Sequence, residues 1–497
     1  MTSIRRRSGL TLVVAAMVVS LVLVACQTHN PGPAGSVGAP ARVSDGPNIV
    51  LITTDDQAVV DLRWMPLTRR LLGAAGATFQ DFLAPHPLCC PARAQILTGQ
   101  YAQNNGVRSN HGEHGGYGAM RDPDHILPAW LREVGYHTSF VGKYINGYRY
   151  HDGIPAGWER WDATVRYGYH GYVQFDGQDL TRPAAYHTDY VAQRSAEEIR
   201  TLAQKDEPFF LWTSFYAPHG VCSPKQEIGC KTPPPVEPQF ARAFRHVRAP
   251  FLDKPSFNED DVSDKPRVVV RRGRVDEAEM QRLFLQRIRA LQSVDLGVAR
   301  IVAALQEAGA LDDTVIAFTS DNGYLYGEHR HTGKTLAYEE SVRVPLLVRG
   351  PGIEPGRVLP QTAAMIDLAP TFAELAGAEP SVPVDGRSLV ELARDPHRVA
   401  DRTLLVQAGI RGPDPKGLDW EYRGVRTGRY TFVYWFKTGF VELYDRRRDP
   451  YELRNVAHDP RYARIVEVLA DRTRELGDCS GAACRGDFGP VPEPRRR

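Results

Sequence analysis

The sequence predicts an α/β protein whose large domain is built on a mostly parallel sheet flanked by helices. Apolar runs that end abruptly in polar residues alternate with helical patterns along most of the chain, as in parallel sheets with helical crossovers. Near residue 395 the pattern changes to short, closely spaced strands, which predicts a smaller C-terminal domain with an antiparallel sheet. A length of 497 residues agrees with two domains, because it exceeds the usual single-domain range.

The N-terminus is typical of an exported protein. Arg5, Arg6 and Arg7 precede the apolar stretch Leu10–Ala25, and a charged region followed by a short apolar one predicts a signal peptide over residues 1–25. The stretch is shorter than a typical membrane-spanning helix. Its end, Leu-Val-Ala-Cys, resembles a bacterial lipobox, which implies a lipid anchor on Cys26 and a cell-envelope lipoprotein. A plain signal peptide and a secreted protein are the alternative.

The segment after the predicted signal peptide separates it from the folded domains. Residues 26–46 are rich in Pro, Gly, Ala and Ser, a composition that predicts a flexible tether. The main domain is then expected over residues 47–395 and the C-terminal subdomain over residues 396–497. The 61 Lys and Arg residues balance the 59 Asp and Glu residues, so the charge gives no indication of a nucleic-acid partner.

Cysteine usage agrees with export. Two pairs lie close enough along the chain to close short disulfide loops outside the cytoplasm: Cys222 with Cys230, and Cys479 with Cys484. Cys89 and Cys90 remain, and neighbouring cysteines seldom bridge each other. One of them therefore needs another explanation.

Four apolar runs of the main domain are predicted as buried strands. Continuous β-branched and aromatic runs fit strands that are covered on both faces, and such sheets bind ligands beyond the carboxyl ends of their strands. The polar residues that follow the four runs should therefore meet at one edge of the sheet. The runs are Asn48–Thr54 before Asp55 and Asp56, His137–Val141 before Lys143, Phe209–Thr213 before His219, and Val315–Ser320 before Asp321 and Asn322.

The remaining elements follow from periodicity and composition. Apolar residues from Phe284 to Leu305 recur every three or four positions, which predicts a long helix with Gly309 at its end. The Pro-rich stretch from Cys222 to Arg274 is expected to be a long loop near the edge of the sheet, either setting substrate choice or serving only as a surface excursion. A helix is expected to start at Asp367–Ala376. Further along, short strands are expected at Thr403–Val406, Tyr422–Thr427 and Tyr430–Trp435, followed by Leu443-Tyr444-Asp445 and then by a helix at Tyr462–Leu476.

The stretch Leu88-Cys89-Cys90-Pro91-Ala92-Arg93 has the features of an anion site. Pro91 is suited to the first turn of a helix, which would place Cys89 just before a helix N-terminus, where N–H groups and the helix dipole favour an anion. Arg93 would lie one turn further in, with a planar fork that matches an oxyanion. A nucleophile and an arginine in this arrangement indicate phosphoryl or sulfuryl transfer.

The same stretch resembles the sulfatase signature Cys-x-Pro-x-Arg followed by Thr-Gly, matched by Cys89, Pro91, Arg93 and Thr98-Gly99. The resemblance covers roughly residues 47 to 460 and implies an alkaline-phosphatase-like fold. In this family the first Cys is oxidised to formylglycine, whose hydrate is the nucleophile. The resemblance therefore implies a formylglycine at Cys89 and a formylglycine-generating system as a maturation partner. Cys90 occupies a variable position and is assigned no chemistry.

The resemblance also implies a metal site and a set of basic catalytic residues. Hard cations such as Ca²⁺ prefer several oxygen ligands, and the paired acids at two strand ends match the family's calcium ligands in order. The implied roles are neutralisation of the sulfate oxygens and protonation of the leaving alkoxide. The metal ligands are Asp55, Asp56, Asp321, Asn322 and the modified Cys89, and the catalytic residues are Cys89, Arg93, Lys143, His219 and Lys334.

One departure from the family pattern bears on the substrate. Many sulfatases have a His two residues after the first Lys, where this chain has Ile145. The sequence Lys143-Tyr-Ile-Asn146 resembles the branch of N-acetylglucosamine-6-sulfatases and heparan endosulfatases, which implies a sugar 6-O-sulfate substrate contacted by Asn146. Two alternatives stay open: a phosphonate or phosphate ester hydrolase of the same superfamily, and a lipid-anchored protein that binds sulfated glycans without cleaving them.

Overall fold

The computed structural model describes residues 45–222, 232–394, 402–410 and 417–495. These residues belong to one compact unit that begins at Ala41. The predicted signal peptide, Cys26 and most of the tether lie outside the described residues, as does Cys230, the expected partner of Cys222. Within the described ranges, no helix is both long enough and apolar enough to cross a membrane.

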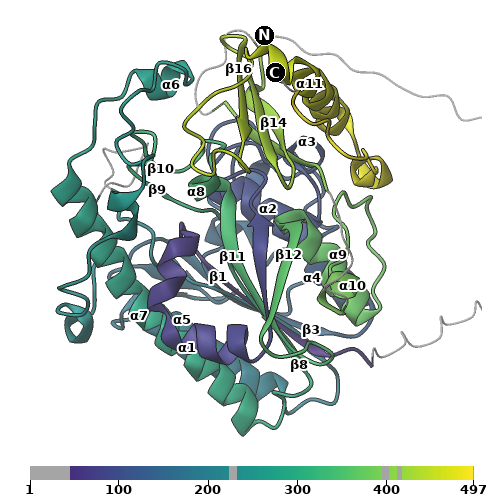
Figure 1. Cartoon of the computed structure of the whole chain (residues 1–497). Coiled ribbons are helices and arrows are strands. Elements are labelled where there is room, and N and C mark those ends of the chain that lie inside the picture. The colour runs from purple at the N-terminus through teal and green to yellow at the C-terminus, as the bar shows by residue number, and fades with distance from the viewer. Residues whose placement is uncertain (1–44, 223–231, 395–401, 411–416, 496–497) are drawn as a thin grey trace, which may run out of the picture. The chain divides into compact units, whose positions relative to one another are not determined.

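A ten-stranded sheet forms the centre of the main domain (Figure 1). Its middle is parallel, since β8, β1, β7, β3 and β4 pair in parallel in that order, whereas β11 is antiparallel to both of its neighbours, β8 and β2. The predicted α/β fold with a mostly parallel sheet is confirmed. In sheet order the strands are β12 (Arg357–Ala364), β2 (Ala77–Leu83), β11 (Arg343–Arg349), β8 (Thr314–Ser320), β1 (Asn48–Thr54), β7 (Phe209–Ser214), β3 (His137–Gly142), β4 (Arg160–Arg166), β5 (Val173–Phe175) and β6 (Leu180–Thr181).

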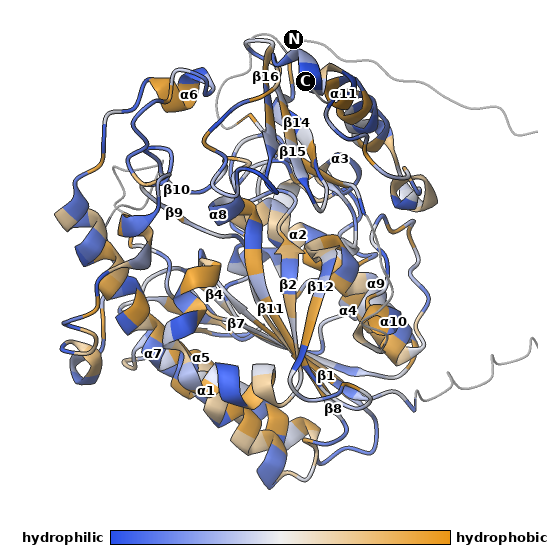
Figure 2. Ribbon diagram, in the orientation of Figure 1, coloured by the Kyte–Doolittle hydropathy of each residue, from blue (hydrophilic) through white to orange (hydrophobic). Residues whose placement is uncertain are grey.

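Alternation along β1 explains why helices cover both faces of the sheet. Ile49 and Leu51 belong to a core on one face, while Val50 and Ile52 belong to a core on the other, as expected where successive side chains of a strand point to opposite faces. Figures 1 and 2 show α2, α4, α9 and α10 on one side and α1, α5 and α7 on the other. Their bounds are α1 Pro66–Thr68, α2 Cys89–Thr98, α4 Leu127–Glu133, α5 His187–Leu202, α7 Glu277–Glu307, α9 Leu368–Ala376 and α10 Val390–Arg394.

The long predicted helix is α7, and it begins earlier than the apolar pattern indicated. Asp276 caps it, because its carboxylate accepts a hydrogen bond from the Glu279 backbone N–H at 2.6 Å. Gly309 follows the end of the helix with a φ of 70°, a left-handed conformation that glycine adopts without strain. In the stretch after Cys222, the described part contains one α-helix, α6 (Arg267–Val270), and otherwise short helical turns.

The C-terminal sheet is antiparallel, as predicted, with its four strands in chain order and α11 packed beside it. The expected disulfide between Cys479 and Cys484 is present. The expected domain boundary at 395/396 falls on residues that the structure does not describe. The elements are β13 Leu404–Gly409, β14 Trp420–Arg426, β15 Tyr430–Trp435, β16 Phe440–Asp445 and α11 Ala463–Asp478; the remaining short ones are α3 Ala102–Asn105, α8 Glu339–Val342, β9 Leu325–Tyr326 and β10 Thr332–Gly333.

A buried arginine joins the two sheets. Arg426 of β14 is 1% exposed and donates to Asp81 of β2 at 2.8 Å and to Glu339 of α8 at 2.6 Å. Opposite charges removed from water must be paired, because an uncompensated buried charge is strongly unfavourable.

We therefore expect Arg426→Met to destabilise the protein by about 3 kcal/mol, because Asp81 and Glu339 would keep their charges without this partner. Denaturant unfolding would measure the loss. The matched control is Arg464→Met, since Arg464 and its partner Glu467 are 64% and 62% exposed, and exposed pairs contribute at most about 1 kcal/mol. Equal losses for the two variants would contradict this role of Arg426.

Candidate active site

Cys89 is the first residue of α2, one position later than its expected place just before the helix. Leu88 is extended and forms the N-cap of α2. Pro91 is the third residue of the helix, within the first turn, where a missing N–H leaves no hydrogen bond unmade. The Cys89 side chain is buried, at 1% exposed. The adjacent Cys90 donates its backbone N–H to the Asn110 side chain at 2.9 Å, a contact that the sequence did not indicate.

Arg93 lies one turn into α2 and holds the acidic residues of two strand ends. Its guanidinium donates to Asp321 at 2.9 Å and to Asp55 at 3.2 Å. It also donates to Ser214 Oγ at 2.7 Å and to the Lys143 carbonyl at 2.6 Å. These bonds occupy most of the guanidinium donors, so the structure gives Arg93 the task of fixing carboxylates. The part played by Ser214, at the end of β7, could not be predicted from an isolated serine.

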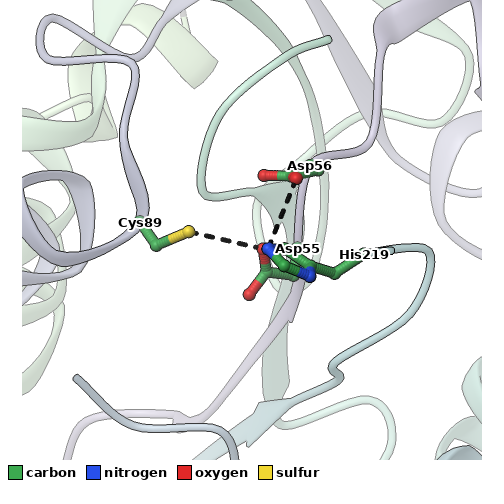
Figure 3. Close-up of side chains that lie close together, drawn as sticks. All are labelled: Asp55, Asp56, Cys89 and His219. Carbon is green, nitrogen blue, oxygen red and sulfur yellow. Dashed lines mark hydrogen bonds and ion pairs between the residues drawn. The ribbon is translucent and has the colours of Figure 1, made fainter. Parts of the chain in front are cut away.

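The ends of β1 and β7 bring Asp55, Asp56 and His219 beside Cys89, as Figure 3 shows. Cys89 Sγ is 3.5 Å from Asp55 Oδ1, and His219 Nε2 is 3.8 Å from Asp55 Oδ1 and 3.6 Å from Asp56 Oδ2. His219 Nδ1 lies 2.6 Å from the Gly220 carbonyl, which only accepts, so this nitrogen carries the hydrogen. Nε2 is thereby directed at the two carboxylates.

The two predicted lysines point into the same cluster. Lys143 pairs with Asp55, while Lys334 pairs with Asp56 and lies 2.9 Å from Cys89 Sγ. Burial alone would raise the pKa of Asp55, but Lys143, His219 and Arg93 hold it well below its ordinary value. Burial would lower the pKa of Lys334, yet Asp56 and its neighbours raise it well above the ordinary range. Both groups are therefore charged.

The donor set fits a hard metal ion. Ligand atoms of Asp55, Asp56, Cys89 and His219 all lie within 4.8 Å of one another. Asn322 donates its amide N–H to Asp56 Oδ1 at 2.8 Å, while its own Oδ1 is buried without a hydrogen-bond partner. A buried carbonyl oxygen without a donor is unfavourable unless a cation or water satisfies it. Carboxylate and amide oxygens are the ligands that Ca²⁺ prefers.

The charge of the cluster suits a divalent cation together with an anionic substrate. Burial and the neighbouring Asp55 raise the pKa of Asp321 to about 6, against the opposing effect of Arg93, which shows how closely the carboxylates crowd. A bound divalent cation would relieve this crowding and leave an excess of positive charge to attract an anion. Without it the charges balance, since the buried carboxylates are Asp55, Asp56 and Asp321 and the basic side chains are Arg93, Lys143 and Lys334.

Asn146 follows Lys143 by three residues and makes no described contact with Cys89. It is half-buried, and its backbone carbonyl accepts from the Tyr117 N–H at 2.8 Å. Its side-chain Oδ1 is buried without a hydrogen-bond partner. The substrate contact of Asn146 stays a prediction.

Comparison with family models identifies the protein class. The model described as "Sulfatase" matches residues 47–378, well over half of the chain. The chain belongs to the sulfatase family. A second model, described as "N-sulphoglucosamine sulphohydrolase, C-terminal", matches residues 327–478 of this sulfatase. It is thus a sulfuric ester hydrolase by family, and the family typically uses a formylglycine and a metal.

Two named relatives resemble this sulfatase over most of its length. The extracellular sulfatase SULF-1 homolog of Drosophila melanogaster is 34% identical over 73% of this chain, but this chain spans only 33% of that protein. The N-acetylglucosamine-6-sulfatase of Homo sapiens is 31% identical over 89% of this chain and 87% of that protein.

Solved structures share the fold of this sulfatase. One, in complex with its substrate D-glucosamine-2-N,6-O-disulfate, has a TM-score of 0.68 at 21% identity, covering 88% of this chain and 98% of the other. The phosphonate monoester hydrolase of Agrobacterium radiobacter also has a TM-score of 0.68, at 23% identity, covering 87% and 95%. At such identities the likeness establishes the alkaline-phosphatase-like fold alone.

The donor set leads to a metal-binding experiment. Calcium should raise the melting temperature of the wild type, by an amount equivalent to about 2.7 kcal/mol at a hundredfold excess over the dissociation constant. Asp56→Asn should lose most of this rise, because one ligand charge is removed. The control is Asp312→Asn, which changes an exposed acid in the turn after α7. A full calcium response in Asp56→Asn would contradict the assignment of Asp56 as a ligand.

Proposed function

We propose that this sulfatase hydrolyses a sugar 6-O-sulfate, using Ca²⁺ and a formylglycine formed from Cys89. The observation that carries the proposal is the position of Cys89. It begins α2 at the point where four strand ends meet, with Lys334 at 2.9 Å and Asp55 at 3.5 Å from its sulfur. A formylglycine hydrate at this position would supply a hydroxyl nucleophile for attack on sulfur.

The surroundings of Cys89 favour an oxygen nucleophile over the thiol. Burial, together with Asp55, raises the pKa of the Cys89 thiol well above its ordinary value, against the opposing effects of Lys143 and Lys334. A thiol that stays protonated is a poor nucleophile. Conversion to a hydrated aldehyde removes the need for an ionised sulfur.

The other residues have roles that follow from their contacts. Lys143 and Lys334 are already in contact with the buried carboxylates, so on substrate binding they are placed to neutralise sulfate oxygens. Arg93 keeps Asp55 and Asp321 oriented. His219 is placed to give a proton to the leaving alkoxide through Nε2, the nitrogen that faces the cluster. Burial lowers the pKa of His219 to about 4 and Nδ1 holds the hydrogen of the neutral ring, so Nε2 must first take up a proton before it can act as the acid.

The substrate class rests on the relatives and on the sequence after Lys143. Relatives named N-acetylglucosamine-6-sulfatase match most of the chain at 31% identity, and the sequence Lys143-Tyr-Ile-Asn146 resembles the pattern of that branch. Asn146, with its buried and unpartnered Oδ1, is proposed as an acceptor for a sugar hydroxyl. We further propose action outside the cytoplasm, either anchored through Cys26 or secreted, after maturation by a formylglycine-generating system of the host.

The test is release of sulfate from N-acetylglucosamine-6-sulfate by protein expressed together with a maturation system. Cys89→Ala should lower kcat/KM by at least ~10³-fold, because the nucleophile is removed. The matched control is Cys90→Ala, a neighbouring buried cysteine, which should stay within about tenfold of the wild type. Full activity in Cys89→Ala would contradict the proposed nucleophile.

Two further experiments, one with another substrate and one that measures binding alone, distinguish the proposed function from its alternatives. A phenyl phosphonate monoester cleaved faster than any sulfate ester would favour the phosphonate hydrolase, whose fold this chain shares. Calcium-dependent retention on a sulfated-glycan column, without sulfate release, would favour the binding protein.

A further inference from the structure

One arginine of α7 contacts three of the loops that build the site. Arg287 is 1% exposed and donates to the backbone carbonyl of Asp56, which follows β1. It also donates to the backbone carbonyl of Pro218, which follows β7, at 3.1 Å. Its guanidinium lies 3.9 Å from the centre of the Tyr324 ring, which follows β8.

These loops carry the proposed metal ligands and the proposed acid. Asp56 is itself a ligand, Pro218 directly precedes His219, and Tyr324 comes two residues after Asn322. A single rigid guanidinium therefore links the two carboxyl-bearing loops to the histidine loop. No described contact joins Arg287 to the side chains of Asp55, Cys89 or Lys334, so it acts on the site through main-chain atoms.

The conformation of Asp56 explains why such a contact is needed. Asp56 has a φ of 69°, a left-handed backbone conformation that is unfavourable for residues other than glycine. The turn directs its carboxylate toward His219 and Lys334. Its N–H donates to Asp321 Oδ1 at 3.1 Å, and its carbonyl accepts from Arg287. Both main-chain polar groups of this residue are thus held by side chains.

The far side of Arg287 is equally enclosed. Its Nε donates to the Tyr326 hydroxyl at 2.7 Å, and that hydroxyl lies 3.0 Å from an oxygen of the buried Asp61. The ring of Tyr326 stacks on Phe251 at a centroid distance of 4.8 Å. The guanidinium is consequently fixed from behind by a packed hydrogen-bonded group, which makes it a firm support for the loops in front of it.

We propose that Arg287 is a positioning residue that holds Asp56 in its left-handed conformation and sets Asp56 and His219 at their mutual distance. The inference rests on the proposed function of the site, in which Asp56 is a metal ligand and His219 the acid. A lysine at this position keeps the charge, but its single ammonium cannot reach both carbonyls and the Tyr326 hydroxyl with fork geometry.

The experiment compares Arg287→Lys with Arg289→Lys. Arg289 lies two residues further along α7 and also donates to a backbone carbonyl, that of Ala243, at 2.8 Å, away from the site. In Arg287→Lys we expect calcium affinity, measured by calorimetry, to fall about tenfold and kcat to fall at least tenfold, with KM changed less than about threefold. In Arg289→Lys all three values should stay within about twofold of the wild type.

Crystal structures of the two variants separate failure of this inference from failure of the proposed function. Asp56 should leave its left-handed conformation in Arg287→Lys and keep it in Arg289→Lys, whether or not the protein proves to be a calcium-dependent sulfatase. Wild-type calcium affinity and an unchanged Asp56 in Arg287→Lys would overturn the inference. If Arg287→Lys does not fold, Tyr326→Phe replaces it. A fall in calcium affinity in Tyr326→Phe supports the inference, and an unchanged affinity contradicts it.

Discussion

The structure of the site depends on ion pairs between Arg93 and two carboxylates, Asp55 and Asp321, none of which is exposed. Charges this deeply buried are tolerated only when opposite charges and hydrogen bonds compensate them. Because Arg93 is part of α2, the helix that begins with Cys89, its pairing with the two acids fixes the helix relative to the ends of β1 and β8. The place of the proposed nucleophile is thus set by electrostatic pairing as well as by packing.

The parallel sheet stabilises a fold that can hold this many buried charges at one edge. Strands β8, β1 and β7 are mostly apolar along their length and polar at their carboxyl ends, so the hydrophobic cores on the two faces support a polar edge. At that edge the basic side chains balance the acidic ones, and the buried Asn322 Oδ1 has no protein donor. Burial strengthens every electrostatic interaction there. A hard cation and a sulfate group are the ligands that this combination of donors, acceptors and charges accommodates.

Much of the fold and the polar edge followed from local patterns, whereas the supporting contacts did not. The strand Asn48–Thr54 was predicted with its observed bounds, because a continuous apolar run ending in two acids has few other interpretations. The proximity of Cys89, Lys334 and His219 followed from the family resemblance, since 245 positions of sequence separate the first two. Ser214, Asn110 and Arg287 were not predicted. Ser214 and Asn110 each act through one polar side-chain group, and Arg287 acts on backbone carbonyls. Contacts of this kind leave no periodic pattern or motif spacing in the sequence.

The most direct test of the central claim is mass spectrometry of the peptide that contains residues 89 and 90, from protein made in its own host. We expect residue 89 to have lost its sulfur and gained an aldehyde oxygen, and Cys90 to remain a thiol. The two adjacent cysteines share burial and helix position, so conversion of the first alone would identify it as the matured nucleophile. Intact thiols at both positions, in protein that still releases sulfate from a sulfate ester, would contradict the claim.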